Sequence, residues 1–285
     1  LANVVNVFLT YGLIFGVWGL PELGAVGSAW ATFLSRLLAA VILLWAMSRG
    51  RNGVTIGGRN SWLPEIPVAR SVLQIGVPAA VEQVLISAAF TVLTIVVAGL
   101  GTGALAAHRI AFNALSLSFL PGFGFSIAAT ALVGQSVGAR RLQEGSDAAH
   151  TAARWGAMWM GAMAVVFFLL ATPIMQAFTD EAEVIRLGAS SLRVLAFSQP
   201  FWALLFVYSG SLRGLGNTNF PLRVNTLGIW GTVLLSWLVV SLWNGGLAEV
   251  WAAFILTSPV MAFVLFRRFR NDILNAPAPQ PVAGD

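Results

Sequence analysis

The stretch "RSVLQIGVPAAVEQVLISAAF", residues 70–90, is almost entirely apolar or small, yet it contains one carboxylate, Glu82. A bilayer core about 30 Å thick is crossed by about 20 apolar helical residues, so this stretch predicts a membrane-spanning helix. The whole chain has the same character, because 58% of its 285 residues are hydrophobic and 9% are charged. Soluble domains carry about 25% charged residues. The sequence therefore predicts a polytopic membrane protein.

Short breaker-rich turns and charged loops separate the apolar segments of the chain. The expected fold is an all-α bundle of transmembrane helices. The sequence predicts eight spans, at residues 2–18, 24–47, 71–99, 103–138, 148–178, 182–212, 219–243 and 247–268.

The arginines predict the orientation of the chain. If the spans alternate, 12 of the 16 arginines fall on one side, with the loop 48–70, whereas the other side carries mainly acids. Cytoplasmic loops are rich in Lys and Arg, so we expect both chain ends in the cytoplasm of a cell whose inner membrane holds the protein. The proline-rich tail, residues 271–285, is expected to be disordered. The 12 arginines are Arg49, Arg51, Arg59, Arg70, Arg140, Arg141, Arg154, Arg213, Arg223, Arg267, Arg268 and Arg270.

Several kinds of site find no support in the sequence. There is no cysteine, the two histidines stand far apart, and no Ser-His-Asp, paired-acid or His-Glu-x-x-His pattern occurs. We therefore expect no enzyme activity, no cofactor and no metal site. The net charge of +5 is explained by membrane orientation, so a nucleic-acid partner is not expected.

Glu82 is the main candidate functional residue. It lies 12 residues beyond Arg70, about 18 Å along a helix and close to the bilayer midplane, where an acid costs at least about 2.5–3.5 kcal/mol. Burial disfavours the charged form of a carboxyl, so such a group can hold a proton and release it to water or a cation. We expect Glu82 and its neighbour Gln83 to couple ions or anchor a substrate. The alternative is a protonated side chain that only packs against another helix.

Other residues extend this candidate site. Pro78 lies four residues before Glu82 and predicts a kink beside a cavity. Asn113 and Ser116 are three residues apart and share a helix face, which lines a cavity or packs between helices. Gln199 is expected in mid-membrane in the sixth span. In the long span 103–138, we expect a bend or local unwinding at Pro121, Gly122 and Gly124.

Three segments together resemble one family. They are "IGVPAAVEQVL", "GLGTGALAAHRIAFNALSLSFLPGFGFSIAATALVGQSVGARR" and "GSLRGLGNT", and in this order they resemble the multidrug and toxic compound extrusion (MATE) transporters, most nearly the DinF-like branch. Family members have twelve helices in two six-helix lobes. On this resemblance, residues 1–47 match the last two helices of the first lobe and residues 71–270 match the second lobe. The chain is then expected to be an N-terminally incomplete copy. A faint repeat between Trp30–Leu34 and Trp251–Ile255 agrees with duplicated halves.

The resemblance implies a secondary antiporter that exports organic, often cationic, compounds while protons or sodium enter. Its partners would be small organic substrates and membrane lipids, and it is expected to be a monomer. Glu82 matches the family's membrane-embedded glutamate. Asn6 is kept from an Asn-x-x-x-Asp pattern, but Thr10 stands at the acidic position, and Trp202 replaces an Asp of the sodium-coupled branch. These departures favour protons over sodium. The alternatives are a lipid-linked precursor flippase, which a basic cavity would favour, and a membrane protein that transports nothing.

Overall fold

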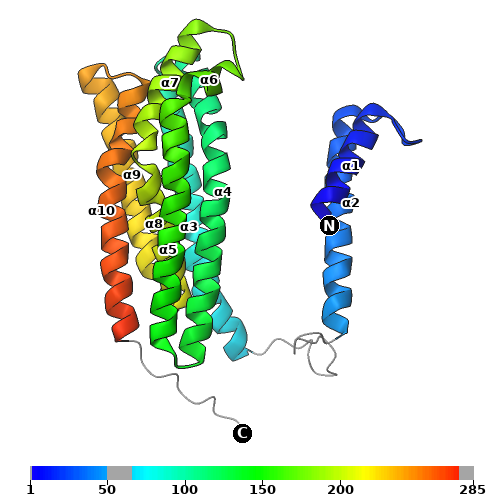
Figure 1. Ribbon diagram of the computed structural model, residues 1–285, viewed down its shortest axis with the longest axis vertical. Coiled ribbons are helices and arrows are strands. Elements are labelled where there is room, and N and C mark those ends of the chain that lie inside the picture. The colour runs from blue at the N-terminus through cyan, green and yellow to red at the C-terminus, as the bar shows by residue number, and fades with distance from the viewer. Residues whose placement is uncertain (1, 50–65, 276–285) are drawn as a thin grey trace. The chain divides into compact units, whose positions relative to one another are not determined.

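The computed structural model describes residues 2–49 and 66–275, which form ten α-helices and no strand (Figure 1). The predicted all-α class is therefore confirmed. The chain divides into two compact units, Leu1–Arg70 and Ser71–Asp285, called here the first and the second unit.

The first unit contains two packed helices, α1 (Ala2–Phe15) and α2 (Gly24–Ser48). The Leu23 amide, at the start of α2, donates a hydrogen bond of 2.9 Å to the carbonyl oxygen of Leu13 in α1. The side chain of Leu13 is buried. The contact fixes the turn that joins the two helices.

The second unit is a bundle whose longer helices run side by side along its length (Figure 1). Its first helix, α3, begins five residues before the unit boundary. The helices are α3 (Ile66–Ala98), α4 (Thr102–Gly138), α5 (Leu142–Leu169), α6 (Ala171–Gln176), α7 (Ala182–Ala196), α8 (Gln199–Gly214), α9 (Asn219–Trp243) and α10 (Leu247–Leu274).

The predicted number of eight spans is not confirmed. Among the described residues, six helices are long and apolar enough to cross a membrane, and α7 with α8, bent by 54°, makes a seventh when taken as one broken span. Pro200, the second residue of α8, explains the break, because proline has no N–H and its ring clashes with the carbonyl four residues earlier. The helix α1 has 14 residues, fewer than a crossing requires.

The ends of three helices correct the prediction. The helix α3 begins at Ile66, inside the predicted loop 48–70. The helix α5 begins at Leu142, before the start of the predicted span 148–178. The helix α10 continues to Leu274, so the predicted disordered tail begins as helix. Asp272 forms a 2.8 Å ion pair with Arg268 one turn earlier, which stabilises this last part of α10. Residues 276–285 of the predicted tail and residues 50–65 of the predicted loop lie outside the described residues.

The helix α4 is uninterrupted. Its backbone stays helical through Pro121, Gly122 and Gly124, so the unwinding considered there does not occur, and a bend at these residues stays a prediction. The helix α3 likewise continues through Pro78.

Small residues let α8 approach α4 closely. In "GSLRG", residues 210–214, a Cβ added to Gly210 would lie 2.6 Å from the carbonyl oxygen of Ser126. A Cβ on Gly214 would lie 2.6 Å from the carbonyl oxygen of Thr130. Two glycines four residues apart are a common device for packing membrane helices. The contact fixes the backbone of α8 on both sides of Arg213.

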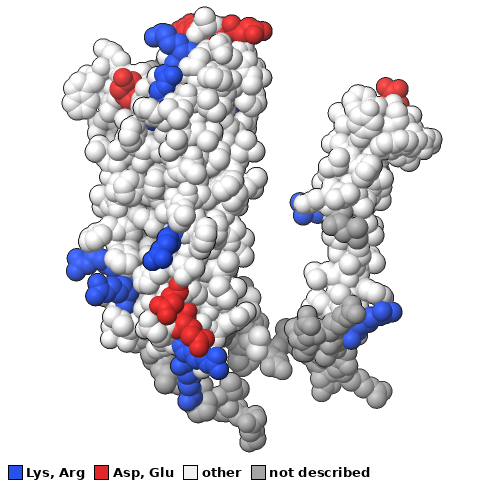
Figure 2. Space-filling view, in the orientation of Figure 1, with Lys and Arg blue, Asp and Glu red and all other residues white. Residues whose placement is uncertain are grey.

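Charged side chains on the visible face of the bundle gather toward its two ends, with a broad, largely uncharged band between them (Figure 2). This distribution fits the long apolar helices, because charged groups at membrane depth are costly. The structure therefore describes a multi-pass membrane protein.

Candidate functional site

Glu82 lies in the middle of α3 and is paired, not isolated. Its side chain is 3% exposed. Its Oε1 atom accepts a hydrogen bond of 2.7 Å from Nη2 of Arg213, in the last turn of α8, and a second of 2.7 Å from Nδ2 of Asn225, in α9. Residues from three helices therefore meet at one carboxylate oxygen, and the negative charge has a cation beside it inside the bundle.

The turn between α8 and α9 holds Arg213 and Asn225 in position. Gly216 has a φ of +82°, which favours glycine. Its amide donates to the carbonyl of Arg213 at 2.9 Å, and the next amide, of Asn217, donates to the carbonyl of Leu212 at 2.9 Å. This is the Schellman end of a helix. Asn217 then accepts a hydrogen bond from the Phe220 amide at 3.2 Å, so one side chain caps the start of α9.

Asn225 connects Glu82 to α8 a second time. Its Nδ2 atom also donates to Oγ of Ser209 at 3.0 Å, and both residues are buried. Three buried polar atoms of this cluster have no hydrogen-bond partner, namely Oε2 of Glu82, Nε of Arg213 and Oδ1 of Asn225. Buried polar atoms usually have partners. The cluster therefore has unused hydrogen-bonding groups that one more polar group could satisfy.

A contact near the start of α3 gives the depth of Glu82 in the bundle. The Oγ1 atom of Thr218, in the α8–α9 turn, donates to the carbonyl oxygen of Gln74 at 3.5 Å. Glu82 lies eight residues further along α3, about 12 Å at 1.5 Å per residue. The carboxylate is thus about two helical turns inside the bundle from the level of that turn.

Most of the other predicted residues do not join Glu82. Gln83, Asn113 and Ser116 are exposed, and Pro78 is partly buried. The hydroxyl of Ser116 donates to the backbone carbonyl oxygen of Asn113 at 2.6 Å, so this hydroxyl is satisfied within its own helix. Their role in binding stays a prediction.

Gln199 belongs to a separate buried cluster at the break between α7 and α8. Its Oε1 atom accepts a hydrogen bond of 2.8 Å from the hydroxyl of Ser118, in α4. One turn later, Nε1 of the buried Trp202 donates to Oγ of Ser258, in α10, at 2.8 Å. These contacts tie the broken helix to its neighbours on both sides.

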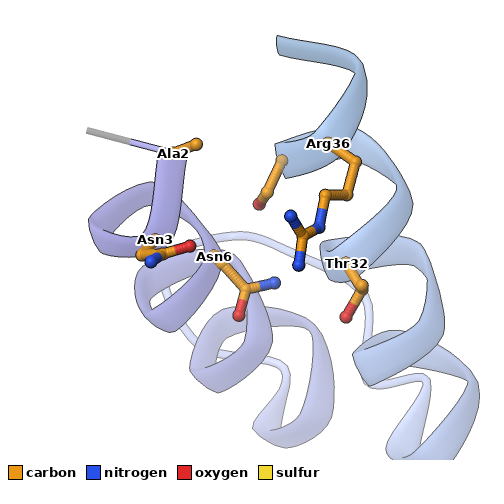
Figure 3. Close-up of a pocket in the computed structure, with 6 residues that line it drawn as sticks. Ala2, Asn3, Asn6, Thr32 and Arg36 are labelled. Atoms are coloured by element: carbon orange, nitrogen blue, oxygen red, sulfur yellow. The ribbon is translucent and has the colours of Figure 1, made fainter. Parts of the chain in front are cut away.

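Asn6 lies in a polar pocket of the first unit. The pocket is lined by Asn3, Asn6, Thr32, Ser35 and Arg36, with Ala2 at its edge. The Arg36 side chain reaches from α2 toward Asn6 and Thr32 (Figure 3). The other predicted residue of α1, Thr10, is not among the lining residues.

Sequence reasoning missed the partners of Glu82. Arg213 was predicted to lie in a cytoplasmic connection, and Asn225 and Ser209 were given no role. The sequence marks the position of Arg213 but not its pairing, because Arg213 stands between Gly210 and Gly214, which pack closely against α4. Among the described residues, no three His, Cys, Asp or Glu side chains come together as metal ligands would.

Two curated proteins are similar to this chain in sequence. It is 30% identical over 256 residues to a probable multidrug resistance protein NorM of Thermotoga maritima, covering 90% of this chain and 55% of that protein. It is 34% identical over 235 residues to the multidrug resistance protein NorM of Burkholderia vietnamiensis, covering 80% of this chain and 50% of that protein. The chain therefore spans about half the length of the curated relatives it matches.

Solved structures share the fold. A multidrug resistance MATE family transporter of the MOP superfamily, in an outward-facing conformation, matches 98% of this chain and 62% of its own, with a TM-score of 0.89 and 22% identity. A MOP superfamily transporter from Pyrococcus furiosus matches 97% of this chain and 61% of its own, with a TM-score of 0.88 and 22% identity. The fold is that of a helical membrane transporter. Residues 78–238 match the MatE family model, and the chain belongs to the MATE family.

Proposed function

We propose that the protein is a secondary antiporter that exports organic compounds, often cationic, in exchange for protons. Several relatives are named multidrug resistance proteins, and this supports the substrate class. The observation that carries the proposal is the position of Glu82. It is a buried carboxylate whose Oε2 atom has no partner, in a helix apolar enough to span a membrane. Such a group can take up a proton or an organic cation, and each displaces the other.

Glu82 is also suited to report binding to the rest of the bundle. It joins α3 to α8 through Arg213 and to α9 through Asn225. A change in the charge of Glu82 alters both contacts at once, because hydrogen bonds to an ionised carboxylate are stronger than those to a neutral one. An alternating-access cycle requires two conformations that differ in their affinity for the proton, and contacts that change with the charge of Glu82 support such a difference.

The proposal includes the setting of the protein. We place it as a monomer in a bacterial inner membrane, with the end of the bundle that carries the α8–α9 turn in the cytoplasm. Arg140 and Arg141, between α4 and α5, and Arg267 and Arg270, late in α10, lie near that end, which supports this orientation. The same proposal assigns the protein to the DinF-like branch. It also gives a role in binding to Gln83, Asn113, Ser116, Gln199, Asn6 and Thr10.

Efflux from vesicles tests the proposal. The protein is reconstituted with an organic amine inside, a proton gradient is imposed, and Glu82→Gln is compared with wild type. We expect gradient-driven efflux in wild type and its loss in Glu82→Gln. The matched control is Glu144→Gln, because the Glu144 side chain is 64% exposed and its ion pair with Arg141 is long, at 3.5 Å. Efflux that persists in Glu82→Gln would remove Glu82 from the coupling.

A second candidate function is a flippase for a lipid-linked precursor. One observation favours it, namely the pocket of the first unit, in which Arg36 lies beside Asn3, Asn6 and Thr32 (Figure 3). A cation among hydrogen-bond donors suits a phosphate group. For the related transporter from Pyrococcus furiosus, a reversed polarity of the binding pocket suggests a different function. Movement of a fluorescent polyprenyl diphosphate across the same vesicles, without amine efflux, would favour this second function.

A further inference from the structure

The carboxylate of Glu82 already has a cation beside it, the guanidinium of Arg213. We propose that Arg213 is a resident cation that occupies Glu82 when no solute is bound, and that a protonated amine must displace it before binding there. The inference rests on the proposed function and deepens it, because it assigns Arg213 the role of a competitor that sets the affinity of the site and names the class of solute.

The ion pair uses only one oxygen of the Glu82 carboxylate. Arginine often holds a carboxylate with two parallel hydrogen bonds, one to each oxygen. Here Nη2 of Arg213 and Nδ2 of Asn225 both contact Oε1 of Glu82, each at 2.7 Å. The second oxygen, Oε2, is buried without a partner, and so is Nε of Arg213. The pair is therefore held through one nitrogen and one oxygen, and an amine reaches the buried second oxygen only after Arg213 moves.

The two members of the pair differ in their freedom to move. The Arg213 side chain is 30% exposed, whereas that of Glu82 is 3% exposed. A long arginine side chain can withdraw toward water while its stem stays packed. The backbone of Arg213 cannot follow, because Gly210 and Gly214 on either side pack against α4. Displacement therefore requires only a rotation of the Arg213 side chain.

Asn225 keeps the carboxylate in place when Arg213 leaves. Its Nδ2 atom bonds both Glu82 and Ser209, the latter at 3.0 Å. Its Oδ1 atom is buried and has no partner. Oε2 of Glu82 and Oδ1 of Asn225 thus offer two acceptors on adjacent side chains. Two acceptors suit a cation with N–H donors, so the site should prefer a protonated amine to a quaternary ammonium, which has none.

Other charges near this end of the bundle do not contact Glu82. Arg268 and Asp272 of α10 pair with each other at 2.8 Å. Arg223, two residues before Asn225 in α9, is exposed. Among the described residues, Arg213 is the charged side chain that pairs with Glu82. Arg223 therefore provides a matched control with the same charge on a neighbouring helix.

Equilibrium binding to the purified, membrane-reconstituted protein tests the inference. The probes are dansylcadaverine, a primary amine, and its N-trimethylated form, followed by fluorescence. In Arg213→Gln we expect dansylcadaverine to bind at least about tenfold tighter than in wild type, or about 1.4 kcal/mol. Arg223→Gln should bind as wild type does. Equal affinities in Arg213→Gln and Arg223→Gln would overturn the resident-cation role.

Wild-type protein tests both parts of the inference without relying on the folding of a variant. If Arg213 must leave first, the observed binding rate should reach a plateau as the amine concentration rises, whereas a linear rise throughout would contradict displacement. The primary amine should bind at least about tenfold tighter than its trimethylated form. Equal affinities of the two probes would overturn the assignment of the two acceptor oxygens.

The two proposals can fail separately. If Arg213→Gln tightens amine binding but wild type shows no gradient-driven efflux, the antiport function fails and the resident cation stands. If wild type exports the amine and Arg213→Gln binds it as Arg223→Gln does, the resident cation fails and the antiport function stands.

Discussion

Nδ2 of Asn217 donates a hydrogen bond of 2.7 Å to Oδ2 of Asp272, and so ties the turn after α8 to the end of α10. Asp272 also pairs with Arg268 at 2.8 Å. One carboxylate in a segment predicted to be disordered thus supports the turn that positions Arg213. The cluster around Glu82 is thus supported by a contact between residues 55 positions apart in sequence.

Asp272→Ala should destabilise the second unit. The substitution removes an acceptor from Asn217 and a partner from Arg268, and we expect a loss of about 1–2 kcal/mol, since the ion pair is partly exposed and contributes little. Thermal unfolding in detergent measures the effect. Asp147→Ala is the control, because Asp147 is exposed and accepts only a hydrogen bond from Gln143 at 3.1 Å. Equal melting temperatures of the two variants would show that the Asn217 contact contributes nothing.

Gly210→Ala should disturb the packing of α8 on α4. The new Cβ would lie 2.5 Å from the hydroxyl oxygen of Ser126, so the helices must separate, at a cost of about 1–3 kcal/mol. Gly124→Ala is the contrasting variant, because a Cβ there meets nothing within 4 Å and alanine favours a helix by up to about 1 kcal/mol. The unfolding free energies of both variants give the comparison. If Gly124→Ala is stable but lowers efflux, the predicted bend at this residue gains support.

How far the sequence predicts the fold depends on whether the signal is local. The predicted spans 24–47 and 219–243 agree with α2 and α9 within one residue, because apolar length and breakers are local properties. The break at Pro200 was missed, because a proline alone does not predict a break. Pro78 and Pro121 lie within helices that continue. Only the packing around each proline distinguishes these cases.

The candidate site was predicted only in part, because only some of its signals are local in the sequence. The cost of an acid in an apolar segment is visible in the sequence, so Glu82 could be selected. Its partner Arg213 is 131 residues away, and a pairing over that separation leaves no local pattern. Arginines in and near the loops predicted the orientation, and Arg213 was grouped with them.

A double-mutant cycle should show that Glu82 and Arg213 are coupled in stability. Arg213→Met leaves a buried carboxylate without its cation, which costs about 3–5 kcal/mol in such pairs. Glu82→Gln keeps an oxygen for Arg213 and should cost less. The double variant should lose less than the sum, with a coupling above about 1 kcal/mol, measured by equilibrium unfolding in mixed micelles. The same cycle at Arg141 and Glu144, which are 67% and 64% exposed, should give below about 0.5 kcal/mol. Equal coupling energies in the two cycles would show that the Glu82–Arg213 pair contributes no more to stability than an exposed ion pair does.

Removal of sodium should leave efflux unchanged. Trp202 stands where the resemblance places an acid in the sodium-coupled branch, and its indole is buried and donates to Ser258 at 2.8 Å. An indole supplies no oxygen, whereas hard cations such as sodium require several oxygen ligands. Efflux driven by a fixed proton gradient is measured with sodium and with choline in its place. We expect equal rates of efflux, because protons and not sodium ions would bind the Glu82 carboxylate. Efflux driven by a sodium gradient at equal pH on both sides would contradict proton coupling and would point to oxygen ligands elsewhere in the protein.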